Sequence, residues 1–575
     1  MEIADSRAAA PADAIAASAA AAAAQVGAKA ERRALRRFLL LVLVAAGIVL
    51  KASIVPAPVG PHSLDGSNYF QIARHVADGD GLQTSVSLYH QGLRELPHAS
   101  SAYPLWPLVL GGAASSVGLE RAAVLLPSIF YVCSLVLLYS LANAVARGFA
   151  PGGERVPGGR GIVTVGHLAV VLFATNRIYF QHTSLPYSEG LAFTLAFAAL
   201  LALARVDDGD AADGIPRLSW AVLAGALAGF AFLSRSQMVG LVAAIPLALL
   251  PWRRSRGSAG SAGPSGRSLG LAVAALVTAV LVALPWVWSL SRLPAPALPR
   301  ALFDFTAYRE TPELAPFELF VATDGPIALL RDRVQGLLVA FSPASSYSYA
   351  RSFGMSLYLV PLAALAWIVS RRRPAALSGA RRSAVLPTAM LLTAVFCVLP
   401  VHLHHATYIW PWWFQWRHGL PMIFAIVLAL AWSNARAPVA VRIPALLLVA
   451  STIATAPLAL GSVAQELRAS RRGPSPDEVA LLRWVTRQPQ PPVLVATMPQ
   501  VLAAYARGAK YHWIACSDPP SQLDVMFDAL HADGVVVAPG EERCAFAAAL
   551  VARGPATHRF GAISVWSRAD AAPAL

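Results

Sequence analysis

The sequence predicts a mainly α-helical, polytopic membrane protein, a helix bundle with a small α/β domain at its C-terminal end. Of its 575 residues, 56% are hydrophobic and 13% are charged, whereas soluble domains carry about 25% charged residues. Long apolar runs recur up to residue 470, and short alternating strand and helix patterns follow from residue 474. The shortage of charge indicates that much of the surface faces lipid.

Membrane-length apolar runs define the bundle. A bilayer core requires about 20 apolar residues in a helix, and the sequence predicts about eleven such spans. They lie near residues 38–54, 122–146, 161–180, 187–205, 217–234, 236–252, 268–290, 356–370, 384–401, 419–433 and 441–462. The segment Tyr103–Val117 is also apolar, but Pro104, Pro107 and Gly111–Gly112 indicate a helix that lies at, or dips into, the membrane interface.

Arginines beside these runs predict the orientation of the chain. Four arginines lie between residues 32 and 37, and positive residues favour the cytoplasmic end of a span. The Ala-rich residues 1–31 are therefore expected to be a disordered or loosely helical cytoplasmic tail. Every segment that parity then assigns to the cytoplasm carries arginine, which also accounts for the net charge of +15 without nucleic acid. We expect residues 32–470 to span the cytoplasmic (inner) membrane, with long outside loops at 55–121, 291–355 and 402–418.

The C-terminal residues 474–575 are predicted to form a small extracytoplasmic domain. Strand and helix patterns alternate there, which is typical of an α/β sheet. The predicted strands are 491–497, 511–515, 534–538 and the edge strand 560–567, and the predicted helices are 499–506, 521–530 and 541–553. A GxGxxG fingerprint is absent, so we predict no nucleotide site. Cys516 and Cys544 fit either a disulfide, which an extracytoplasmic compartment permits, or two free thiols.

A polar segment, LDGSNYFQIARHVADGDG at residues 64–81, follows the first apolar run. It places Asp65 near the edge of the hydrocarbon core, with Tyr69 four residues later. An ionisable group at a membrane rim is costly unless it is solvated or used, so Asp65 is a candidate functional acid. The alternative is that Asp65 only caps the helix that starts near Asn68.

Three more charged groups are expected at the outer ends of spans. Glu189, in SLPYSEGLAF, begins one span, although a helix N-terminus also favours a negative charge without any function. Arg235, in FLSRSQM, lies in an outer turn, where a guanidinium can bind a lipid phosphate or simply reach the headgroups. Arg417 and His418 form a basic pair in WPWWFQWRHGLP, whose tryptophans fit an interfacial aromatic belt equally well.

Three histidines, His402, His404 and His405, lie on the same predicted loop. Imidazole binds zinc or manganese, so these residues are weak candidates for a metal site. Histidines at a membrane interface are also ordinary, and the interpretation stays open.

Four short blocks, LDGSNYFQIA, SAYPLWPL, PYSEGL and WRHGLP, occur in an order and with an outer placement that resemble the GT-C glycosyltransferases. These are multispanning enzymes that use polyprenyl-phosphate sugars. The resemblance covers most of residues 30–470 as an arrangement. It is nearest to the bacterial branch with aminoarabinose transferases, protein mannosyltransferases and lipopolysaccharide-core transferases. His418 stands where an aromatic residue is more usual, so that block matches in part.

The resemblance implies a transferase that moves a hexosyl or pentosyl group from a polyprenyl phosphate or diphosphate to an envelope glycan, lipid or protein on the outer side of the membrane. It implies that Asp65 and Glu189 are the catalytic acids, with Asp65 the first choice for the base and Glu189 a second acid that either assists the base or binds a metal. The implied substrate-binding residues are Tyr69, Tyr103, Arg235, Arg417 and His418. A divalent metal stays open, and no other cofactor is expected.

Two other classes of function are compatible with the same sequence. An O-antigen-ligase-like transferase would use arginine and histidine of the late loop 402–418 without an acid in the first loop. A lipid-linked sugar carrier or flippase would place polar groups inside its spans and show an internal repeat, and we find few such groups and no convincing repeat. A structural scaffold is the remaining alternative.

Overall fold

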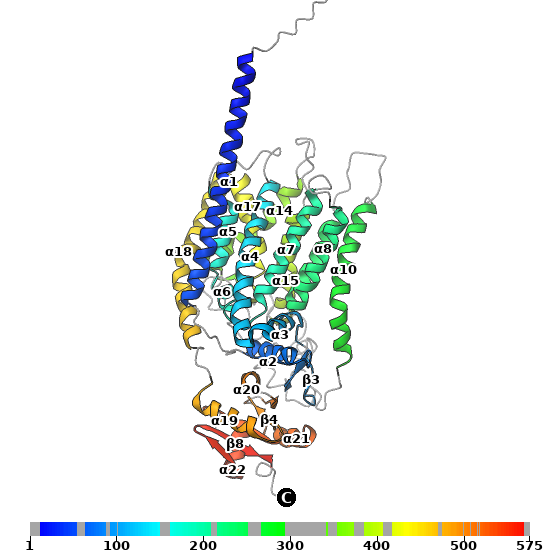
Figure 1. Ribbon diagram of the computed structural model, residues 1–575, viewed down its shortest axis with the longest axis vertical. Helices are drawn as coiled ribbons and strands as arrows, with labels where there is room; N and C mark the ends of the chain where they lie inside the picture. Colours follow the sequence, from blue (N-terminus) through cyan, green and yellow to red (C-terminus); the bar gives the residue numbers. More distant parts are fainter. Residues whose placement is uncertain are drawn as a thin grey trace, which may run out of the picture.

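The computed structural model describes residues 12–54, 64–87, 93–100, 102–149, 162–208, 215–250, 266–293, 341–342, 353–372, 385–405, 417–436, 438–469, 474–497, 499–506, 508–514, 516 and 518–568. Long helices form a bundle, and a small sheet domain covers one end of it (Figure 1). The N-terminal helix projects from the opposite end (Figure 1). The predicted loops 291–355 and 402–418 lie mostly outside the described residues.

Six helices in the described part of the chain are long and apolar enough to cross a membrane. They are the membrane-length stretches of α1 (Ala12–Ile54), α4 (Leu119–Phe149), α7 (Glu189–Asp208), α8 (Arg217–Ser234), α10 (Gly266–Ser291) and α18 (Val439–Ala469). In the apolar stretch of α7 67% of the residues are buried, against 17% in α10. The bundle is therefore built around α7, while α10 presents an apolar outer face. Helix α1 begins at Ala12 and so includes much of the segment predicted as a tail.

Shorter apolar helices fill the rest of the bundle. They are α3 (Leu105–Val117), α5 (Val165–Ala174), α9 (Val239–Leu249) after η4 (Ser236–Met238), α14 (Val360–Arg372) after η7 (Gly354–Leu359), α15 (Val385–His405) and α17 (Met422–Arg436). The prediction of about eleven spans is therefore established for six helices only. One predicted span, 161–180, is broken: α6 (Arg177–His182) starts anew because the Asn176 side chain accepts from the Tyr179 N–H at 2.9 Å.

Small residues let the helices approach closely. A Cβ at Gly225 on α8 would lie 2.1 Å from the Ala275 carbonyl oxygen on α10, so only glycine fits there. Gly111 does the same at the outer end of the bundle, where a Cβ would lie 2.6 Å from the Ala73 carbonyl oxygen. The second contact seats α3 directly against α2 (Leu64–Asp78). The position of α2 is thus fixed by the bundle beneath it.

The segment predicted as the first outside loop joins the C-terminal sheet. Its strands β1 (Gln83–Thr84) and β3 (His98–Ala99) pair with each other, whereas β2 (Val86–Ser87) pairs in parallel with β5 (Lys510–Trp513). The Arg74 guanidinium on α2 donates to the Ala504 carbonyl at 2.6 Å. Strand β2 was not predicted, because nothing in two residues of a polar loop signals pairing with a strand more than 400 positions away.

The C-terminal domain is an α/β sheet, as predicted, with strand order β2-β5-β4-β6-β8-β7. Its other strands are β4 (Val493–Ala496), β6 (Gly534–Val537), β7 (His558–Phe560) and β8 (Ile563–Ser567), and its helices are α19 (Pro476–Arg487), α20 (Pro499–Tyr505), α21 (Ser521–Ala529) and α22 (Ala545–Arg553). The predicted single edge strand is a hairpin, because a turn at Gly561, which has φ of +60°, separates β7 from β8.

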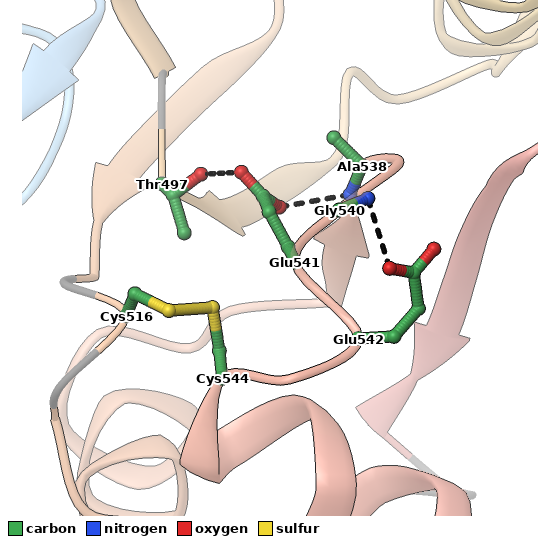
Figure 2. The surroundings of a disulfide bond; sticks show 7 residues. All are labelled: Thr497, Cys516, Ala538, Gly540, Glu541, Glu542 and Cys544. Carbon is green, nitrogen blue, oxygen red and sulfur yellow. Dashed lines mark hydrogen bonds between the residues drawn. A yellow bond between two sulfur atoms is a disulfide. The ribbon is translucent and has the colours of Figure 1, made fainter.

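Helix α22 was predicted to start at Glu541, but it starts at Ala545. The Glu541 carboxylate accepts from the Ala538 N–H at 2.8 Å and from the Thr497 hydroxyl, which holds residues 538–541 in a turn (Figure 2). Cys544 then precedes the helix and forms a disulfide with Cys516 (Figure 2). Of the two predicted states of these cysteines, the structure contains the bridge.

Candidate functional site

Helix α2 carries the first acid of the site. Asp65 lies in its first turn, and its carboxylate accepts a hydrogen bond from the Arg417 guanidinium. The Asp65 side chain is 37% exposed, whereas that of Arg417 is 8% exposed. The Asp65 carboxylate is therefore accessible to solvent, while the Arg417 guanidinium balances its charge.

Hydrogen bonds to the backbone next to Arg417 hold this residue in place. The Gln237 amide in η4 donates to the His418 carbonyl at 2.5 Å and to the Cys397 carbonyl at 2.8 Å. Burial opposes the charged form of Arg417, but the negative charges of Asp65 and Glu189 outweigh it and raise the pKa of the guanidinium. The positive charge at this position is therefore permanent.

Glu189, the first residue of α7, forms the second acid–arginine pair. Its Oε1 accepts from Arg235 Nη1 at 2.6 Å and lies 3.0 Å from His182 Nδ1. The Glu189 side chain is 1% exposed, and its Oε2 has no hydrogen-bond partner among the described residues. Glu189 is thus enclosed, unlike Asp65.

Tyr69 lies between the two pairs. It is one helical turn after Asp65, so both side chains lie on one face of α2. Burial, followed by the negative charge of Asp65, raises the pKa of the Tyr69 hydroxyl far above its usual value, and Arg235 and Glu189 act on the same group. Tyr69 therefore stays protonated and can donate a hydrogen bond beside Arg235.

Aromatic residues brace the second pair. The Trp106 indole N–H on α3 donates to the Pro186 carbonyl at 2.7 Å, which fixes the turn that leads to Glu189. Tyr103 lies against Trp286 and Phe232, with ring centroids 4.9 Å and 6.0 Å away, and interacts electrostatically with Arg235. Tyr103 thus packs against neighbouring aromatic rings close to Arg235.

Two residues near the network were not singled out as site candidates by the sequence prediction, His182 and Lys51. His182 stacks on Tyr187, with ring centroids 4.5 Å apart, and faces Glu189. The Lys51 amine on α1 donates to the Thr183 carbonyl and lies 5.2 Å from the Tyr131 ring centroid. A histidine seven residues before a candidate acid, in the same outer turn, was a usable signal for His182. A lysine in an apolar run was the signal for Lys51.

The structure therefore brings Asp65, Tyr69, Tyr103, Glu189, Arg235 and Arg417 into one electrostatic network. His418 adjoins Arg417 in the chain and is buried. His402, His404 and His405 end helix α15, and their side chains lie outside the described part of the structure.

A metal site was left open by the sequence. Each acid of the network already has an arginine partner, and the described residues contain no group of three histidine, cysteine or carboxylate side chains that could hold a metal ion. The side chains of the network therefore fit arginine pairing better than metal binding.

The fold is similar to that of membrane transferases of known structure. The apo oligosaccharyltransferase of Archaeoglobus fulgidus is 12% identical, and the match covers 88% of this chain and 69% of that one with a TM-score of 0.53. ArnT from Cupriavidus metallidurans in the apo state is 14% identical, and the match covers 93% of this chain and 98% of that one with a TM-score of 0.50. ArnT has also been solved bound to undecaprenyl phosphate; that state is 13% identical over 93% of this chain and 99% of ArnT, with a TM-score of 0.46.

No protein-family profile and no curated protein sequence matches the chain. The predicted resemblance is therefore confirmed for the fold, which the chain shares with an oligosaccharyltransferase and with ArnT.

Proposed function

We propose that the protein is a membrane glycosyltransferase that moves a sugar from a polyprenyl phosphate or diphosphate to a glycan, lipid or protein of the cell envelope. The observation that carries the proposal is the presence of two electrostatically linked ion pairs at one end of a GT-C-type bundle. They are Asp65 with Arg417 and Glu189 with Arg235. Residues more than 300 positions apart converge there, which a lipid-facing scaffold does not require.

Exposure assigns the roles of the two acids. A general base must reach the acceptor hydroxyl directly or through one water, and the 37% exposed side chain of Asp65 can do so. Glu189, at 1% exposure, cannot without rearrangement. Asp65 is therefore the base, and Glu189 holds Arg235 in a fixed orientation.

The reaction then proceeds as a displacement at the anomeric carbon. Asp65 takes the proton of the acceptor hydroxyl as that oxygen forms the new glycosidic bond. The bond between the anomeric carbon and the phosphate oxygen breaks, and the leaving lipid phosphate carries away the electron pair. Arg235 and Arg417 stabilise its charge, as guanidinium groups do for phosphates, and Tyr69 donates a further hydrogen bond.

We place the site on the outer side of the cytoplasmic membrane. The disulfide Cys516–Cys544 lies in the domain that packs on α2, and disulfides persist in oxidising, extracytoplasmic compartments. The arginine-rich stretch 32–37, which precedes the apolar run within α1, favours a cytoplasmic N-terminus. The N-terminal part of α1 and the sheet domain lie at opposite ends of the bundle (Figure 1). These two signals agree.

The proposal is tested by mass spectrometry of envelope glycans and lipids from cells with and without the chain. We expect one sugar modification to disappear without it and to return on complementation. Identical glycan and lipid profiles would contradict the proposal. An Arg417→Ala variant that loses transfer while Asp65→Asn retains it would favour the ligase-like alternative.

A further inference from the structure

A pocket lies beside α2, apart from the acid–arginine network. Its volume is about 580 Å³, within the range of about 300–1,000 Å³ that ligand sites occupy. We call it the outer pocket. Its lining includes Phe70, Arg74, Asp78, Ser115, Glu120 and Tyr505, which come from α2, from the end of α3 and start of α4, and from α20. Both the bundle and the C-terminal domain therefore build its wall.

The outer pocket and the proposed catalytic site use different faces of one helix. Asp65 and Tyr69 are four residues apart and share a face, and Phe70, Arg74 and Asp78 repeat the same spacing on another face. Phe70 is five residues from Asp65, a rise of about 7.5 Å along the axis. A ligand in the pocket thus lies within a short distance of the base without occupying its place.

The chemistry of the outer pocket disfavours an anion. Two carboxylates, Asp78 and Glu120, line it together with a single guanidinium, Arg74. That guanidinium already donates to the Ala504 carbonyl and lies 5.7 Å from the Phe70 ring centroid. A phosphate headgroup would meet net negative charge.

The same lining suits a neutral, hydroxyl-rich ligand. Carboxylates accept hydrogen bonds from hydroxyl groups, and the Ser115 hydroxyl adds a further polar group. The Tyr505 hydroxyl oxygen is buried and has no hydrogen-bond partner among the described residues. Burial, then the charges of Glu478 and Glu120, raise the pKa of Tyr505 to about 12, so it remains a donor at neutral pH. The ring of Phe70 supplies an apolar surface.

We propose that the outer pocket binds a neutral oligosaccharide, the part of an acceptor glycan that lies behind the hydroxyl reacting at Asp65. The role of this sugar as an acceptor rests on the proposed function, whereas the binding of a sugar to the pocket does not.

The test measures binding, so that it does not depend on transfer. Full-length protein in lipid nanodiscs is titrated with mannotriose, galactotriose and chitotriose, and saturation-transfer NMR reports contact. Ser115→Trp fills the pocket from an exposed position. Ser116→Trp is the matched control, because Ser116 is exposed as well but does not line the pocket.

We expect at least one trisaccharide to bind, with an affinity that Ser115→Trp lowers at least tenfold and Ser116→Trp leaves unchanged. Absence of binding by all three sugars, or equal effects of the two substitutions, would overturn the proposal. If binding follows this pattern but the chain transfers no sugar, the outer pocket stands and the proposed function fails. If Asp65→Asn abolishes transfer while Ser115→Trp leaves sugar binding intact, the reverse holds.

Discussion

The two acid–arginine pairs share one chemistry but differ in exposure. In one pair Asp65 is 37% exposed, and in the other Glu189 is 1% exposed. An exposed carboxylate can exchange its arginine for a substrate at little cost, whereas breaking a buried pair leaves an uncompensated charge. Under the proposed function, burial rather than residue type separates the reactive acid, Asp65, from the positioning acid, Glu189.

The largest effect is expected at the exposed acid. Asp65→Asn removes the base but keeps the shape of the side chain, so the rate of sugar transfer should fall about 10²- to 10⁴-fold. The melting temperature of the purified protein should fall less than in Glu189→Gln, because the Asp65 side chain is partly solvated and Glu189 still acts on the Arg417 charge. Transfer assays and thermal unfolding of the same preparation check both halves. A large drop in melting temperature would mean that Asp65 is structural.

The buried pair should behave in the opposite way. Glu189→Gln leaves Arg235 buried without a counter-charge and should destabilise the protein by about 3–5 kcal/mol. Thermal unfolding in detergent measures this. A Glu189→Gln, Arg235→Met double variant should recover part of the loss, because no buried charge remains. An unchanged melting temperature in the single variant would refute the assignment of Glu189 as a positioning residue.

Lysine substitutions at Arg417 and Arg235 test the same difference between the exposed and the buried ion pair. Lysine keeps the charge but loses the planar fork that binds phosphate at two points. Arg417→Lys should weaken binding of undecaprenyl phosphate about 10- to 100-fold, the loss of one charged hydrogen bond, with little change in stability. Arg235→Lys should weaken binding and lower the melting temperature as well. Equal melting temperatures for the two variants would remove the distinction.

The smallest effect is expected at the residue between the pairs. Tyr69→Phe deletes a single neutral hydroxyl, worth about 0.5–1.5 kcal/mol, so transfer should slow about two- to tenfold. Ile72→Val, at a buried position of α2 outside both the network and the outer pocket, is the control for packing and should leave the turnover rate unchanged. A Tyr69→Phe variant with wild-type turnover would place the hydroxyl outside the reaction.

Much of the fold follows from local patterns in the sequence. Apolar length predicted the long helices, and Pro-marked alternation predicted β4, α20 and β6 within a few residues. The break at Asn176 had a local signal as well, since asparagine is a preferred N-cap residue. The eleven-span count went further than helix length supports, because several helices of the bundle are short and packed among others.

The candidate residues could be listed from the sequence, but their pairing could not. Placement at the outer ends of spans and the resemblance of short blocks selected Asp65, Glu189, Arg235 and Arg417. Which acid meets which arginine depends on how α2, α7 and the turn before α17 pack, and nothing local links Asp65 to a guanidinium 352 positions later. His182 had a local signal, its place seven residues before Glu189, but its contact with Glu189 depends on the folded turn.

The most direct test of the central claim uses cells whose only copy of the chain carries Asp65→Asn at wild-type abundance in the membrane. Mass spectrometry of their envelope should show the same missing sugar modification as cells without the chain. An envelope indistinguishable from the wild type would contradict the assignment of Asp65 as the base of a glycosyl transfer.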